Sequence, residues 1–103
     1  MPFGLTEHTV EQITSVFEAH PEIKEVILYG SRAKENYKPG SDIDLACHGE
    51  KLTRATINQI HRELDDLLLP YTIDLSDIKT ISNKDLLDHI TRVGKVFYQR
   101  PDK

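Results

Sequence analysis

The sequence predicts a small α/β (α+β) domain in which helices pack on one mixed sheet. Apolar residues recur with helical spacing at residues 6–20 and 53–68, and short apolar runs typical of strands stand at 25–29 and 71–76. Helical and strand-like periods that alternate along a chain are typical of mixed folds. At 103 residues the chain has the length of one domain, which we expect to span 1–103.

The first half of the chain predicts a helix, a strand and a loop. Residues 6–20 carry a helical apolar stripe, which Pro21 ends because proline cannot continue a helix. Glu25-Val26-Ile27-Leu28-Tyr29 is typical of a short buried strand. A loop with Pro39-Gly40 then leads to a second strand at about 42–47.

The second half repeats this alternation. Thr53 is a good N-cap for the helix at 53–68, and Pro70 introduces the strand at 71–76. Asp77 falls where that strand ends, which indicates a turn or cap residue. The remaining elements are a third helix opened by Ser82-Asn83-Lys84-Asp85, similar to a capping box, and closed by Gly94, then a short final strand, Val96-Phe97-Tyr98.

Two carboxylates stand two residues apart in the second strand, Asp42 and Asp44. Residues at i and i+2 of a strand point to the same face, so both carboxylates project together. Adjacent carboxylates repel each other, and a cation relieves that repulsion. Mg²⁺ is often held by one or two carboxylates and substrate phosphates. The alternative is an edge strand whose acids are simply solvated.

A third carboxylate, Asp74, alternates with Ile73 and Leu75 in the third strand. Its side chain therefore leaves the face that the apolar residues bury. If the two strands are neighbours, three carboxylates share one patch. Three acids can hold two metal ions, one at the attacking oxygen and one at the leaving phosphate.

The Gly30-Ser31 pair follows the first strand, and Arg32-Ala33-Lys34-Glu35 can start a helix there. Glycine lets the backbone turn sharply and approach a ligand closely. Free amides at a helix start favour anions, and the Ser31 hydroxyl can donate to a phosphate oxygen. The alternative is an ordinary turn with Ser31 as the N-cap.

Together these motifs resemble the DNA-polymerase-beta-type nucleotidyltransferase superfamily. That pattern is a hydrophobic residue and Gly-Ser, about ten residues, Asp-hydrophobic-Asp, and a third acid between hydrophobics. The resemblance covers about residues 20–98 and implies a palm-like fold, with ATP as substrate and Mg²⁺, in two ions, as cofactor. It implies Asp42, Asp44 and Asp74 as catalytic metal ligands. For nucleotide binding it implies Gly30, Ser31 and Arg32. Many relatives read Gly-Ser-Arg-Ala-Arg-Gly, whereas Lys34 and Glu35 stand at the last two places here.

The shortness of the chain and Gly-Ser-Arg-Ala resemble the minimal nucleotidyltransferase (MNT) branch. Many such proteins are similar to antitoxins that transfer AMP to helical HEPN toxins. Larger superfamily members add a helical domain for the acceptor, whereas this chain ends soon after Asp74. We therefore expect a HEPN-type partner in a hetero-oligomer, with a hydroxyl as acceptor. Two alternatives stay open: a small-molecule acceptor such as an aminoglycoside, and a non-catalytic nucleotide-binding module that masks its partner.

Composition narrows the partners and the compartment. The net charge is −4 and the pI about 5.7, so we do not expect long nucleic acid as a partner. We see no signal peptide or apolar run of membrane-spanning length, and expect a cytoplasmic protein without a membrane partner. Cys47 is expected to be a small buried residue. The five histidines lack the spacing of a zinc site, and we expect a solvated pair between His61 and Asp65.

Overall fold

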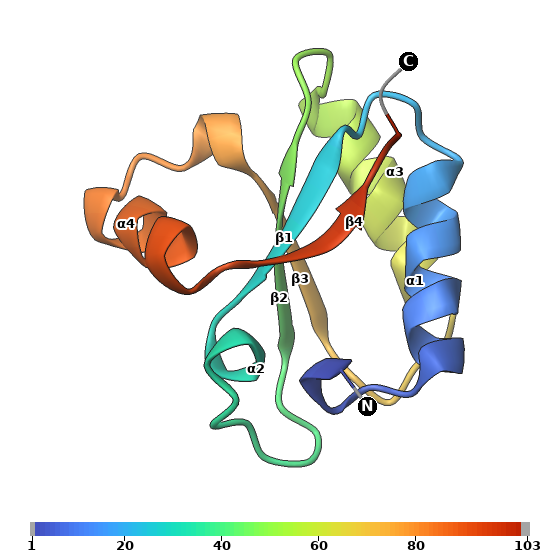
Figure 1. The fold of residues 1–103 in the computed structure, drawn as a ribbon. Helices are drawn as coiled ribbons and strands as arrows, with labels where there is room; N and C mark the ends of the chain where they lie inside the picture. Colours follow the sequence, from blue (N-terminus) through green and yellow to red (C-terminus); the bar gives the residue numbers. More distant parts are fainter. Residues whose placement is uncertain (1, 102–103) are drawn as a thin grey trace.

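The computed structural model describes residues 2–101 and shows a four-stranded mixed sheet with helices on both faces (Figure 1). The predicted fold class is confirmed. In chain order the elements are η1 (Pro2–Gly4), α1 (Glu7–Glu18), β1 (Glu25–Tyr29), α2 (Ser31–Lys34), β2 (Ile43–His48), α3 (Arg54–Asp65), β3 (Ile73–Asp77), η2 (Ile78–Thr80), α4 (Lys84–Val93) and β4 (Lys95–Gln99).

The sheet has the strand order β3-β2-β1-β4. β1 lies at its centre and pairs antiparallel with both β2 and β4, whereas β2 and β3 run parallel. The parallel pair is possible because α3 carries the chain back across the sheet between the two strands, as parallel connections require. Consequently the C-terminal end of β1 and the N-terminal ends of β2 and β3 lie side by side at the same end of the sheet.

The two faces of the sheet are covered differently. α1 and α3 lie on one face and α4 on the other (Figure 1). The main core fills the first face, where alternate residues of the strands point inward: Val26, Leu28, Ile43, Leu45, Cys47, Ile73 and Leu75. A smaller cluster of Tyr29, Ala46 and Ile90 joins α4 to the second face. The carboxylates of Asp44 and Asp74 alternate with the core residues and therefore lie on the second face.

Cys47 confirms the prediction of a small buried residue. Its side chain is fully buried, and its thiol donates to the Ser76 carbonyl at 3.3 Å. Burial, aided by the charge of Asp77, raises the pKa of Cys47 to about 12. The thiolate is therefore scarce at neutral pH, which makes this cysteine unreactive in the folded chain.

The helix caps confirm one prediction and correct another. Thr53 caps α3, where its hydroxyl accepts from the Thr56 amide at 3.1 Å. The predicted third helix is α4, and its N-cap is Asn83 and not Ser82. The helix therefore begins one residue later than the predicted capping box implies. The Asn83 side-chain oxygen accepts from the Leu86 amide at 3.1 Å, and asparagine is among the strongest N-cap residues.

The end of the helix α3 also differs from the prediction, whereas the cap at Asp77 agrees with it. α3 ends at Asp65, three residues before its apolar stripe does, and Leu68 takes a left-handed φ of 56° in the turn that follows. Asp77 is a cap as predicted, since its carboxylate accepts from the Lys79 amide at the start of η2. Within residues 2–101, no helix has both the length and the apolar character needed to cross a membrane.

Candidate functional site

Asp44 and Asp74 occupy directly paired positions of neighbouring strands. The parallel register of β2 and β3 sets Asp44 beside Asp74, and the antiparallel register of β1 and β2 sets Tyr29 beside Asp44. All three side chains alternate with core residues, so they lie on the sheet face that α1 and α3 do not cover. The structure thus brings together the two carboxylates that the sequence placed 30 residues apart.

Asp42 lies one residue before β2 and is exposed, as Asp74 is. Asp44 is half-buried between them. Burial and the charges of Asp74 and Asp42 raise the pKa of the Asp44 carboxyl. Both other aspartates are therefore near enough to disfavour the charge on Asp44, as the shared strand face predicts.

The Gly30-Ser31 turn lies against this carboxylate pair. Gly30 has φ 77° and ψ −155°, a conformation that side chains rarely adopt. A Cβ at Gly30 would collide with the carboxylate of Asp44. Glycine is therefore required here for the close approach as well as for the turn. Gly30 is the N-cap of α2, and Ser31 is its first helical residue and not its cap.

Tyr29 closes the site on the side of β1. Its side chain is buried, and burial together with the charges of Asp74 and Asp44 raises the pKa of its phenol. The phenol therefore stays protonated well above neutral pH and adds no negative charge to the carboxylate patch.

The donor set fits a divalent cation. Asp42, Asp44 and Asp74 offer oxygen ligands on one face, and burial together with the two neighbouring carboxylates raises the pKa of Asp44. Residues 2–101 hold no cluster of three His, Cys, Asp or Glu side chains already closed around a metal position. The carboxylates thus share a patch without being converged on one point, and the two-ion site stays a prediction.

Arg32 lies inside the protein and not at the phosphate turn. Its side chain is 1% exposed and donates three hydrogen bonds, two to the Ser41 carbonyl and one to the Phe3 carbonyl. Its guanidinium also stacks on the rings of Tyr37 and Tyr71. These contacts favour a role for Arg32 in holding the loop before Asp42, in place of the direct phosphate contact that the family resemblance implied.

His89 is the site residue that sequence reasoning missed. The Gly30 amide donates to its Nε2 at 3.1 Å, and its ring stands edge-on to Tyr29. A lone histidine 59 residues from its partner carries no spacing signal, so only the fold could reveal it. The expected pair of His61 and Asp65 is also corrected, because His61 Nε2 contacts the Leu75 carbonyl at 3.0 Å.

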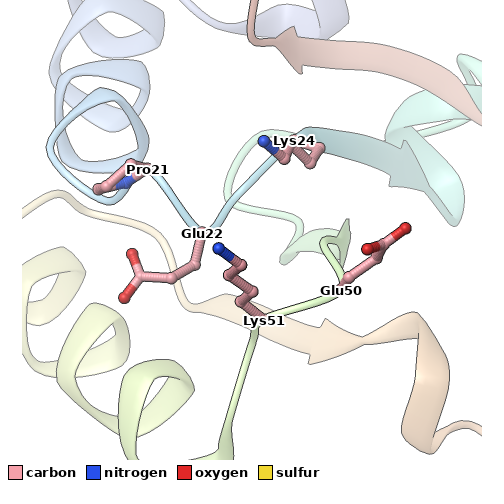
Figure 2. A pocket seen from close by; sticks show the side chains of 5 residues that line it. All are labelled: Pro21, Glu22, Lys24, Glu50 and Lys51. Carbon is pink, nitrogen blue, oxygen red and sulfur yellow. The ribbon is translucent and has the colours of Figure 1, made fainter.

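A pocket of about 350 Å³ lies at the opposite end of β1, lined by Pro21, Glu22, Lys24, Glu50 and Lys51 (Figure 2). Lys24 lies five positions before Tyr29 along the chain, roughly 17 Å of extended strand. Figure 2 shows the two glutamates directed to opposite sides of Lys51. Its two lysines and two glutamates balance in charge, and the pocket contains none of the predicted site residues.

A profile of the polymerase beta nucleotidyltransferase family matches residues 11–103. The chain belongs to this family. It is therefore a nucleotidyltransferase, and the carboxylates and the glycine turn lie within the matched segment. No curated protein matches the chain.

Solved structures of toxin–antitoxin complexes have a similar fold. A toxin–antitoxin with AMP-PNP aligns with a TM-score of 0.71 at 20% identity over 88% of this chain and 73% of that chain. The complex of a tri-AMPylated Shewanella oneidensis HEPN toxin with an MNT antitoxin gives 0.68 at 18% identity, over 93% and 74%. A putative nucleotidyltransferase from Sulfolobus solfataricus gives 0.53 at 17% identity, over 94% and 92%. At these identities the likeness shows the fold.

Proposed function

We propose that this chain is a Mg²⁺-dependent enzyme that transfers AMP from ATP to a hydroxyl of a HEPN-type toxin and thereby acts as its antitoxin. The observation that carries the chemistry is the pairing of Asp44 with Asp74 on the open sheet face, beside the Gly30 turn. The similar toxin–antitoxin structures, one with AMP-PNP and one with an AMPylated HEPN toxin, support the nucleotide and the partner.

In this proposal each site residue has its own task. Asp42 and Asp44 hold the divalent cation, which neutralises phosphate charge and orients the triphosphate when bound. The Ser31 hydroxyl donates to a phosphate oxygen, and Gly30 lets the turn approach Asp44 closely. Asp74, which is exposed at the sheet edge, accepts the proton of the attacking hydroxyl. The hydroxyl oxygen bonds to the α-phosphorus of ATP, and the bond from that phosphorus to the β-phosphate breaks, so that pyrophosphate leaves.

Positioning dominates this kind of reaction. Phosphoryl-type transfers depend on placing the acceptor in line and on balancing charge. The open face beside β3 presents Asp74 to an incoming surface, because α4 packs over β1 and leaves Asp74 exposed. A partner hydroxyl, most simply that of a tyrosine, can therefore approach from outside the domain.

The test is intact-mass spectrometry of a HEPN-type partner, co-purified from the native host, after incubation with ATP and Mg²⁺. We expect added mass that matches one or more AMP units. Asp44→Asn should abolish it, because the carboxamide keeps the side-chain volume and loses the charge. Asp88→Asn is the matched control, since Asp88 is an exposed acid of α4 that pairs with Arg92. It should transfer AMP as the parent does.

Three outcomes contradict parts of the proposal. Normal transfer by Asp44→Asn overturns the assignment of the carboxylates. A stable complex with no added mass indicates a module that masks its partner without modifying it. Absence of any complex, with ATP still consumed in the presence of a small hydroxylated acceptor, indicates a small-molecule transferase.

A further inference from the structure

We infer that His89 is a positioning residue that holds the Gly30-Ser31 turn in place beside Asp44. The contact that carries this is the hydrogen bond from the Gly30 amide to His89 Nε2, at 3.1 Å. The inference concerns the turn itself. Its consequence for nucleotide binding rests on the proposed function.

The Gly30 turn needs an external support. Glycine has more backbone freedom than any other residue, and Gly30, which adopts a φ of 77°, has no side chain that could stabilise this conformation. Its amide is among the first four of α2, which have no acceptor within their helix. α2 spans only four residues, from Ser31 to Lys34, so it offers little rigidity of its own.

His89 supplies that support from another element. Its Nε2 accepts the Gly30 amide, so this nitrogen carries no proton, and a neutral ring carries its proton on Nδ1. The ring packs edge-on against Tyr29, with centroids 6.1 Å apart and planes at 82°. Tyr29 is the strand neighbour of Asp44. One side chain thus links the glycine turn, the central strand and the surroundings of the carboxylate.

α4 is itself anchored where His89 needs it. The residue after His89, Ile90, is buried against Tyr29 and Ala46. Gly94 ends the helix so close to β1 that a Cβ there would collide with Ile27 and with the Ile90 carbonyl. The packing of α4 on the sheet therefore fixes the position of His89 Nε2. Through its hydrogen bond, Nε2 in turn fixes the position of the Gly30 amide.

A simple structural histidine would stabilise the fold without this local effect. Three variants separate the two roles. His89→Leu fills the space and removes the acceptor, and His89→Asn stays polar but is too short to place an oxygen at the Nε2 position. His89→Gln can place a side-chain oxygen there. The matched control is His20→Leu, because His20 is another half-buried histidine whose Nε2 makes one contact, with Glu63 at 2.9 Å.

The first measurement is amide hydrogen exchange of Gly30 by NMR, on the full chain without metal or nucleotide. We expect exchange at Gly30 to accelerate at least about tenfold in His89→Leu and His89→Asn, and His89→Gln to restore most of the protection. His20→Leu should leave Gly30 unchanged. Equal exchange at Gly30 in the parent and in both loss variants would overturn the inference, whatever happens to the melting temperature.

The second measurement is calorimetric titration with Mg²⁺ and AMP-PNP. We expect His89→Leu to weaken binding about tenfold, similar to Ser31→Ala as the reference, and His89→Gln to recover affinity. Undiminished affinity in His89→Leu would overturn the link from the turn to the nucleotide. A parent protein that binds no nucleotide would contradict the proposed function instead, and the exchange at Gly30 would still decide the role of His89.

Discussion

The carboxylate of Asp44 is held where its charged form is disfavoured. It is half-buried near the start of β2, with Asp74 on the neighbouring strand and Asp42 two residues before it. A half-buried carboxylate near two others weakens the fold, but a functional site can keep it because the same negative charge serves binding. The Asp44 carboxylate should therefore lower stability in the metal-free protein.

The pH dependence of stability tests this. Because the pKa of Asp44 is raised in the folded state, folding binds protons between the ordinary value of 3.8 and the raised value. The stability conferred by the protonated carboxyl is full below that window and is lost as pH rises through the folded pKa. In EDTA at pH 7, Asp44→Asn should therefore have a higher urea midpoint than the parent, and the difference should vanish near pH 3. A lower midpoint at pH 7 would contradict the electrostatic picture.

At the scale of elements, Lys79 joins the end of β3 to the loop that follows β2. Its ammonium donates to three carbonyls, of Gly49, Glu50 and Leu52, at 3.0, 3.0 and 3.1 Å. Backbone carbonyls in a loop need partners when they face the protein. Lys79 therefore holds the loop from Gly49 to Leu52 much as a bound cation would.

Removal of this ammonium should destabilise the chain. Lys79→Met keeps the length of the stem and leaves the three carbonyls without their donor, so we expect a loss of about 1–2 kcal/mol in urea unfolding. Lys95→Met, at an exposed lysine of β4, should change stability by less than about 0.5 kcal/mol. Equal effects of the two substitutions would show that water replaces the Lys79 contacts fully.

At the scale of the whole molecule, Arg100 ties the C-terminal strand to the end of the first helix. Its guanidinium donates to the carbonyls of Ile23, Phe17, Glu18 and His20, which lie 77–83 residues earlier. The last carbonyls of a helix have no intrahelical donor, and a cation there also interacts favourably with the helix dipole. Arg100 thus connects the segment after β4 to the segment between α1 and β1, at the end of the sheet away from the carboxylates.

The Arg100 hydrogen bonds should contribute to the stability of the fold and not to nucleotide binding at the carboxylate site. Arg100→Met should lower the free energy of unfolding by about 1–3 kcal/mol, because it removes charge-assisted hydrogen bonds to carbonyls. Its affinity for Mg²⁺ and AMP-PNP should stay that of the parent at temperatures where the variant is folded. Arg92→Met, which breaks an exposed pair with Asp88, should have an effect below about 1 kcal/mol. Loss of nucleotide affinity in folded Arg100→Met would show that the Arg100 contacts and the carboxylate site, at opposite ends of the sheet, are not independent.

Much of this architecture follows from local patterns. β1 has the predicted bounds of 25–29, because an unbroken apolar run between Pro21 and Gly30 is a local signal. The core faces of β2 and β3 follow from alternation, which already put Asp44 and Asp74 opposite the buried residues. The position of the α4 cap was less predictable, since Ser82 and Asn83 are both good caps and only packing selects one.

The sequence by itself determined the elements, the fold family and the residues that carry chemistry, because turns, periodicity and motif spacing involve neighbours along the chain. Tertiary structure alone decided which groups meet. Three contacts of this kind join segments that are distant in the sequence: the pairing of Asp44 with Asp74, the hydrogen bond from Arg32 to Phe3, and the hydrogen bond from Gly30 to His89. Such contacts depend on how whole strands and helices pack against one another. The residues that neighbour each partner along the chain carry no pattern that specifies the contact.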